Sequence, residues 1–198
     1  MKNYLKFYQI IYVLLFSLLL PTISNANEIV ISDNKNSDIY TFQSYANSAE
    51  AVYKSNNYKV NKSGDNYSLF KNDKVYASGN YKSGKLKLYS IDQELFLQVK
   101  IKEDKIKLTI LNEENPWEFK YKGSKIKIMD SLGDEHGKIK FYPETQKTKL
   151  KDSSGNVIVE SKGFSKLSAA MAGIVITPKA KSEDIKVFTT LILLVMNK

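Results

Sequence analysis

The fold is decided by a pattern seen in Lys105-Ile106-Lys107-Leu108-Thr109-Ile110, in which polar and aliphatic residues alternate. Successive side chains of a β-strand point to opposite faces, so such a segment buries its aliphatic face and leaves its ammonium groups in water. An α-helix would scatter the same lysines around its whole circumference. The stretch is therefore predicted to be a strand in a sheet with one face in solvent.

This pattern recurs along the chain. Alternation of lysine with apolar residues begins at positions 85, 105 and 125, a spacing of 20 residues, and further copies begin at 138 and 147. Polar pairs such as Ser83-Gly84 and Gly133-Asp134 separate apolar runs, and such residues favour tight turns. We therefore expect a mainly β protein of about 10–12 short strands joined as hairpins, closed into an antiparallel barrel because open sheet edges invite aggregation.

The C-terminal segment breaks the pattern. From Ile185 to Met196 the chain is apolar apart from one lysine and two threonines, and Ser182-Glu183-Asp184 before it suits a helix N-terminus. A buried strand would also accommodate the β-branched residues, but the length and the capping residues favour a helix at about 182–197. Twelve helical residues span about 18 Å, too short to cross a bilayer. A helix that is apolar all round must be buried, so we expect the barrel to enclose it. Its predicted core residues are Ile185, Phe188, Leu191, Ile192 and Val195.

The N-terminus has the pattern of a secretory signal peptide. Lys2 and Lys6 precede an apolar run at 10–20, Pro21 follows, and Ser24-Asn25-Ala26 supplies small residues for cleavage. The run is about half the length of a membrane span, so cleavage of residues 1–26 is favoured over an uncleaved anchor. The mature protein is expected to be exported, either to a periplasm or out of the cell. Residues 27–56 are predicted to be a polar lead-in, and 57–198 a single barrel domain.

Composition narrows the choice of partners. The chain has 30 basic residues, all of them lysine, no cysteine, and a net charge of +9, of which two charges belong to the signal segment. Lysine is a point charge without the bidentate fork of arginine, so we expect salt-sensitive attraction to an anionic membrane surface or a polyanion, without specific reading of nucleic acid. No partner protein is indicated. The candidate anion-contacting residues are Lys85, Lys87, Lys105, Lys107, Lys125, Lys127, Lys138 and Lys140.

Catalytic chemistry is not indicated. The single histidine, His136, stands in a polar turn where we expect it to be exposed and inert. Paired acids such as Glu113-Glu114, or Glu135 with Glu144, could be imagined as the carboxylates of a hydrolase, but carboxylates in turns usually serve solvation and capping. No phosphate-binding loop or metal-ligand spacing is present. We therefore expect a protein that is not an enzyme and needs no metal or cofactor.

Several segments together resemble the tubby-like superfamily, which includes tubby C-terminal domains, LURP-one-related proteins and phospholipid scramblases. Residues 125–130 with Gly133 and 137–140 resemble its strand, Asp-x-x-Gly turn and return strand, and 149–157 resembles a second copy. Residues 174–178 and 185–196 resemble its final strand and helix. The resemblance implies an antiparallel barrel that encloses one hydrophobic C-terminal helix. It implies no activity, because folds host many functions.

Three functions follow as hypotheses. The leading one is an exported, non-enzymatic binding or structural protein of the cell envelope, whose lysine-covered outer face contacts anionic lipid or polymer. The second is a lipocalin-like carrier with an apolar ligand inside the barrel, which requires the C-terminal segment to pack elsewhere. The third and least favoured is a hydrolase, which requires clustered carboxylates in a pocket.

Overall fold

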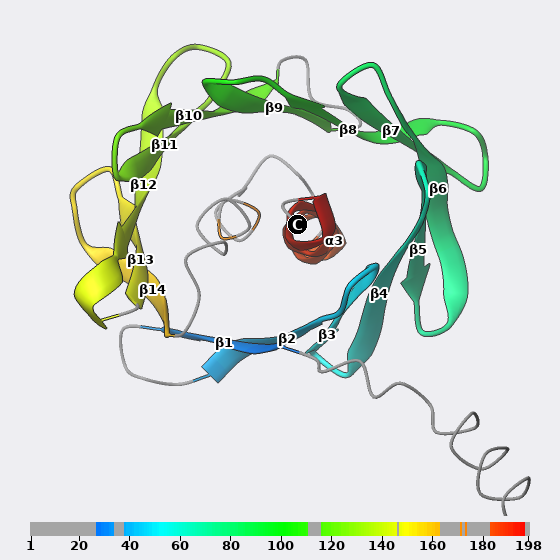
Figure 1. Ribbon diagram of the computed structural model, residues 1–198, viewed down its shortest axis with the longest axis horizontal. Coiled ribbons are helices and arrows are strands. Elements are labelled where there is room, and N and C mark those ends of the chain that lie inside the picture. Colours follow the sequence, from blue (N-terminus) through cyan, green and yellow to red (C-terminus); the bar gives the residue numbers. More distant parts are fainter. Residues whose placement is uncertain are drawn as a thin grey trace, which may run out of the picture.

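A computed structural model describes residues 27–33, 38–110, 116–145, 147–162, 171, 173 and 183–196 of the chain. Within them, fourteen antiparallel strands form a closed barrel around a C-terminal α-helix (Figure 1). This confirms the predicted fold class, although the sequence suggested about 10–12 strands. The elements are β1 (Asn27–Asp33), β2 (Asp38–Ser44), β3 (Ser48–Tyr53), β4 (Asn56–Ser63), β5 (Asn66–Lys71), β6 (Lys74–Lys82), β7 (Lys85–Ser90), β8 (Leu95–Ile101), β9 (Lys105–Ile110), β10 (Trp117–Lys122), β11 (Lys125–Met129), β12 (Glu135–Tyr142), a short 3-10 helix η1 (Pro143–Thr145), β13 (Lys147–Asp152), β14 (Val157–Lys162) and α3 (Glu183–Met196).

The topology is a simple meander. Every strand pairs with its neighbours in sequence, and β1 pairs with β14 to close the ring, with Ile31 opposite Ser161. Most inward positions of the strands are apolar and excluded from water, as in β9, where Ile106, Leu108 and Ile110 are at most 2% exposed. Most outward positions carry polar residues. The alternation in the sequence therefore corresponds to the two faces of the wall.

Two kinds of turn set the register. Some hairpins have two-residue turns such as Asn72-Asp73, where both residues have positive φ and the turn matches the twist of the strands. The β11–β12 and β13–β14 turns are longer and resemble each other: the carboxylates of Asp130 and Asp152 each accept a backbone N–H four residues on, from Asp134 and Asn156. Each of these two hairpins also contains a register shift. The Asp-x-x-Gly segments are therefore bulged turns that hold neighbouring strands in one alignment.

The predicted polar lead-in at 27–56 is wrong, because this part of the chain contains β1, β2 and β3 and belongs to the barrel. The inward residues of β3 are Ala49 and Ala51, which are buried although they are small. Their size weakened the hydrophobic alternation that would have marked a strand. It also leaves room for α3, which lies against the inner side of β3 and β4. The predicted signal peptide, residues 1–26, and the predicted N-cap Ser182 lie outside the described residues.

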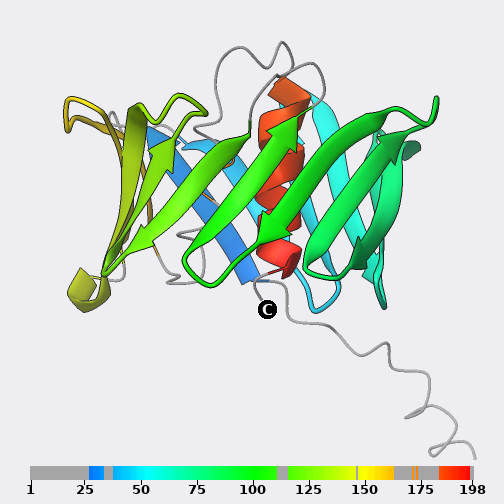
Figure 2. The ribbon, with the colours of Figure 1, turned by 90° about the horizontal axis from the view of Figure 1, so that it is seen from above.

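The helix α3 stands inside the ring, closest to β2, β3 and β4 (Figures 1 and 2). All five predicted core residues of the helix are buried. Phe188 also reaches other strands, since its ring lies 5.3 Å from that of Tyr58 on β4, 4.9 Å from Tyr76 on β6 and 6.3 Å from Phe96 on β8. On another side, a Cβ added to the buried Gly173 would lie 2.6 Å from the backbone nitrogen of Thr190, so this glycine permits close approach to α3.

Among the described residues, no helix is both long enough and apolar enough to span a lipid bilayer.

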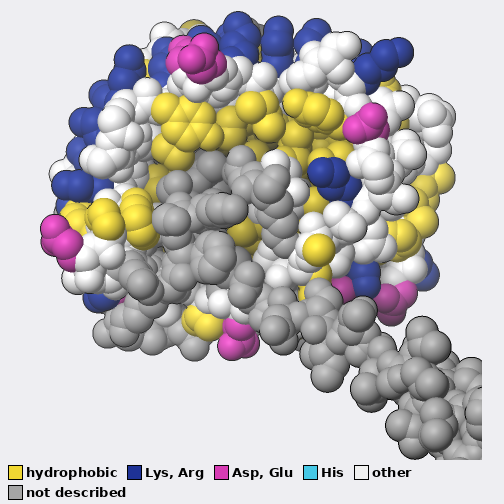
Figure 3. Space-filling model, viewed as in Figure 1, with side chains coloured by type: hydrophobic (Ala, Val, Ile, Leu, Met, Phe, Trp, Pro, Cys, Tyr) yellow, Lys and Arg dark blue, Asp and Glu magenta, His cyan; other side chains and the backbone are white. Residues whose placement is uncertain are grey.

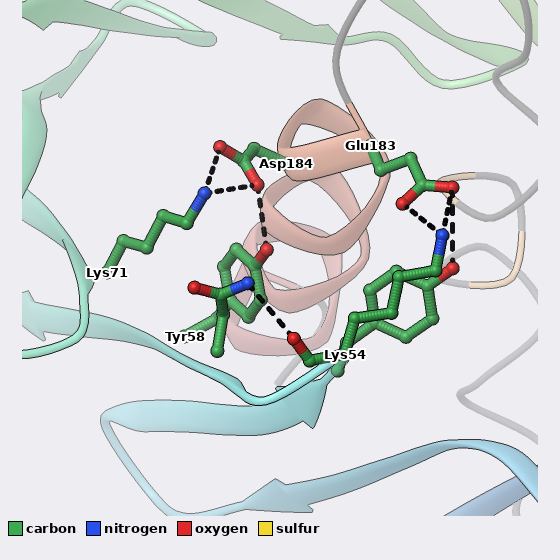
Figure 4. A network of polar contacts seen from close by, with 7 residues as sticks. Lys54, Tyr58, Lys71, Glu183 and Asp184 are labelled. Carbon is green, nitrogen blue, oxygen red and sulfur yellow. Dashed lines mark hydrogen bonds and ion pairs between the residues drawn. The ribbon is translucent and has the colours of Figure 1, made fainter.

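Two acidic residues fasten the first turn of α3 to the barrel wall (Figure 4). Asp184 accepts hydrogen bonds from Lys71 Nζ at 2.7 Å and from the Tyr58 hydroxyl at 2.7 Å. Glu183 pairs with Lys54 Nζ at 2.8 Å in a more exposed position. Both carboxylates also face the positive end of the helix dipole. The polar start of the helix is thus attached to β4, β5 and the turn before β4.

Candidate binding surface

The strand register gathers the outward lysines into rows that run across the strands. Because hairpin partners lie directly opposite, the outward lysine of one strand meets that of the next. We call these series the lysine rows. The first row is Lys105, Lys120, Lys127, Lys138 and Lys151, on β9 to β13. The second row is Lys122, Lys125, Lys140 and Lys149, on β10 to β13, and it ends opposite Glu160. The third row is Lys82, Lys85, Lys100 and Lys107, on β6 to β9, and it ends opposite Glu118.

Charge is distributed unequally around the barrel. The strands β9 to β14 contain twelve lysines and four acidic residues, a net charge of +8. The strands β1 to β3 contain four acidic residues and no lysine, a net charge of −4. In Figure 3 the lysines form a dark blue margin outside the wall that Figure 1 labels β9 to β12. The net charge of the protein is therefore concentrated on one side.

Like charges in neighbouring strands repel one another at this separation. The effect is visible at Lys100, whose pKa is lowered by the adjacent ammonium groups of Lys85 and Lys102. Such pairs do not stabilise the sheet, so the inward apolar residues of the same strands must supply the stability. The clustered lysines therefore give this face of the barrel a positive potential, which attracts anions.

Three glutamates neutralise part of the rows. Glu118 lies among three lysines and is 2.5 Å from Lys107, 3.2 Å from Lys105 and 3.2 Å from Lys120. The hydrogen bonds from Lys107, Lys105 and Lys120 lower the pKa of Glu118 to about 2, so it is ionised at neutral pH. The other two acids pair more simply: Glu135 with Lys127, and Glu160 with Lys147 and Lys149 at 3.5 Å.

The remaining lysines of the first two rows form a patch on β10 to β13. Among the described residues none of them has an acidic partner. Lys140 is held over the ring of Tyr142, 4.9 Å from its centroid, and this contact leaves its charge in place. We call the set the β10–β13 patch. It consists of Lys122, Lys125, Lys138, Lys140 and Lys151.

The eight lysines predicted from the sequence all lie on the barrel strands, but they are not equivalent. Lys125, Lys138 and Lys140 belong to the β10–β13 patch. Lys105, Lys107 and Lys127 are paired with glutamates. Lys85 belongs to the third row, while Lys87 lies opposite Asn80 and Gln98 and outside the rows. Sequence reasoning missed Lys82, Lys100, Lys120, Lys122, Lys149 and Lys151 as members of the rows. Two of them could have been found from the sequence, because the two-residue turns Ser83-Gly84 and Gly123-Ser124 place Lys82 and Lys122 opposite Lys85 and Lys125.

The described residues that were considered for catalysis form contacts with neighbouring residues of the barrel wall and its turns. His136 is exposed, with its Nε2 atom 2.7 Å from Asp130 Oδ2 and its ring 5.1 Å from that of the buried Trp117. The bond from His136 and the backbone N–H groups of the turn lower the pKa of Asp130. Glu135 is paired with a lysine, and Glu113-Glu114 lie outside the described residues. In the described part of the chain, no three His, Cys, Asp or Glu side chains gather in a way that could hold a metal ion.

A concave feature lies over β2 to β4. It is a hollow of about 360 Å³, lined among others by Thr41, Gln43 and Asn57. Three charged residues line the hollow, of which Glu50 and Lys59 form an ion pair 2.7 Å apart and Asp73 is an exposed acid. The hollow therefore offers no gathered positive charge, and it is a weaker candidate than the lysine rows.

Comparison with known proteins does not assign a family or a function to this surface. No protein-family model, curated protein or solved structure matches the chain.

Proposed function

We propose that this protein is an exported, non-enzymatic binding protein of the cell envelope that attaches to an anionic surface through its lysine rows. The observation that carries the proposal is the register of β9 to β13, which aligns five lysines across five successive strands. The export signal in the sequence supports the location. An envelope supplies the partner, since anionic lipids and polymers are its common charged components.

Attraction of this kind is governed by screening. The Debye length shrinks from about 10 Å at 0.1 M salt to about 3 Å at 1 M, so contacts made by exposed lysines weaken sharply. The test is co-sedimentation of the protein with anionic vesicles and, separately, with a soluble polyanion at both salt concentrations. We expect binding to at least one of them at 0.1 M and its loss at 1 M. Absence of binding to both at 0.1 M, or binding that is insensitive to salt, would reject the proposal.

The carrier alternative is not favoured by the packing. A carrier needs free space inside the barrel, and α3 lies there against β2 to β4. The inward side chains of β7 to β9, including Leu86, Leu97 and Leu108, are fully excluded from water. Apolar surface that is already buried offers no further gain to an incoming ligand. We therefore keep binding on the outer face as the single proposed function.

A distant relationship to the tubby-like superfamily belongs to the same proposal. Its support is the order of the elements, in which antiparallel barrel strands precede a C-terminal helix inside the ring. The bulged turns at Asp130 and Asp152 add to this support. The relationship concerns ancestry and fold alone. A crystal structure whose strands and helix failed to superpose on a tubby domain in the same order would reject it.

A further inference from the structure

The lysine rows define the shape of the ligand as well as its charge. We infer that the ligand is a linear polyanion, of the phosphodiester or polyphosphate kind, that lies across the strands along the second lysine row. This inference rests on the proposed function and narrows its ligand from any anionic surface to a chain. The residues that would contact the chain first are Lys122, Lys125 and Lys140, all of them exposed.

The first argument is the unneutralised charge. Lys122 lies opposite Lys125, and Lys125 lies opposite Lys140, on three adjacent strands. Neighbouring strands are about 4.8 Å apart, well within a Debye length, so the three ammonium groups repel one another. Among the described residues, no carboxylate pairs with any of them. A chain with closely spaced negative groups would relieve every one of these repulsions at once.

The second argument is the shape of the wall. The rows run around the barrel, across the strands, and the wall bends between β9 and β13 (Figure 1). A flat membrane can lie against only part of a convex wall, whereas a flexible chain can follow the bend and contact a whole row. The ring of Tyr142 lies beneath two neighbouring lysines of the row, 4.9 Å from Lys140 Nζ and 5.8 Å from Lys149 Nζ. That ring keeps both ammonium groups close to the wall, along the path of the chain.

The third argument is the type of residue. The protein has no arginine, so it lacks the bidentate fork with which single phosphate headgroups are held in a fixed orientation. A row of interchangeable point charges instead fits a polymer whose charged groups are also interchangeable. Affinity then comes from many weak contacts and should increase with the length of the chain.

The test compares two triple variants with the unmodified protein. The patch variant K122Q/K125Q/K140Q removes three charges from the second row. The control variant K74Q/K87Q/K102Q removes the same charge from exposed lysines that lie outside the three rows. Long-chain inorganic polyphosphate, tripolyphosphate, and phosphatidylglycerol-containing vesicles serve as probes at 0.1 M salt. Thermal unfolding of each variant confirms that the barrel is intact.

We expect the unmodified protein to bind long-chain polyphosphate more tightly, per phosphate, than it binds tripolyphosphate or vesicles. The patch variant should lose about tenfold or more in affinity for the long chain, and the slope of affinity against salt should become shallower. The control variant should lose less than about threefold. Equal losses in both variants, or vesicles bound as well as the long chain, would overturn the inference and leave the proposed function standing. Failure to bind any probe would overturn both.

Discussion

Glu118 is an acidic residue in the middle of the lysine rows, and its environment decides how the wall responds to pH. Three lysines surround its carboxylate, which is only 15% exposed. Without this residue, Lys105, Lys107 and Lys120 would face one another with no anion between them. The single negative charge therefore permits a denser packing of lysines than the sheet alone would tolerate.

The variant E118Q should lose a pH-dependent part of the stability. The folded protein holds the pKa of Glu118 at about 2, below the usual value of 4.5, so the ionised form stabilises the fold above about pH 4.5. This contribution is lost as the pH falls from about 4.5 to 2. We expect E118Q to be less stable than the unmodified protein by on the order of 1 kcal/mol at pH 7, after allowance for screening, and equally stable near pH 2.

Urea unfolding at several pH values between 2 and 7 measures this difference. The matched control is E103Q, which removes an exposed acid from the β8–β9 turn. The control should follow the unmodified protein at every pH. A deficit of E118Q that is the same at pH 2 and at pH 7 would show that the ion pairs are not its cause.

At the scale of single elements, many strands of the barrel wall could be predicted from the sequence. Lysine and aliphatic residues alternate so cleanly in β7, β9 and β11 that no other structure fits, and the predominantly apolar run of α3 required burial. β3 was missed because its inward residues, Ala49 and Ala51, are small for a reason that only the packing of α3 reveals.

The candidate site could be predicted from the sequence only in part, because the grouping of its lysines depends on the register of the strands. The sequence shows that lysines face outward, but it does not show which lysine lies opposite which. Lys105 and Lys120 belong to one hairpin whose alignment cannot be counted from a short turn, in contrast to Lys122 and Lys125. The position of Glu118 among three lysines from β9 and β10 is likewise a product of pairing.

The attachment of α3 to the wall yields a second prediction. Asp184→Ala removes a carboxylate that is 16% exposed and leaves Lys71 and the buried Tyr58 hydroxyl without this acceptor. The expected cost is about 1–3 kcal/mol, the usual penalty for an unsatisfied buried polar group. Glu183→Ala is the matched control in the same helical turn, where the pair with Lys54 is exposed and should contribute little because water and salt screen it. Chemical unfolding of both variants measures the difference, and equal losses would show that the burial of Asp184 has no special importance.

At the scale of the whole molecule, the barrel depends on its helix. Eight apolar residues of α3 are buried, and each contributes about 1.5–3 kcal/mol as an upper estimate. Their combined contribution is at least as large as the net stability of a typical domain, about 5–15 kcal/mol. Removing the helix would expose the inward face of β2, β3 and β4 to water at the same time.

A chain that ends at residue 182 should therefore fail to fold. We expect it to be insoluble, or to lack the near-ultraviolet circular dichroism and the cooperative urea transition of the unmodified protein. The control is a chain that ends at Met196, which keeps all of α3 and should unfold as the unmodified protein does. A soluble, cooperatively folded chain without the helix would instead support the cup-like barrel of an apolar carrier.

The order of the elements has a consequence for biosynthesis. All fourteen strands precede α3 in the chain, and the ring closes only when β1 meets β14, about 130 residues later. All strands of the wall are therefore synthesised before α3, the helix that covers β2 to β4. The apolar surfaces of these strands stay uncovered in the nascent polypeptide until α3 has been made. Such late, long-range closure is slow. If the protein is exported as proposed, the polypeptide would complete its interior only after translocation, once α3 has followed the strands across the membrane.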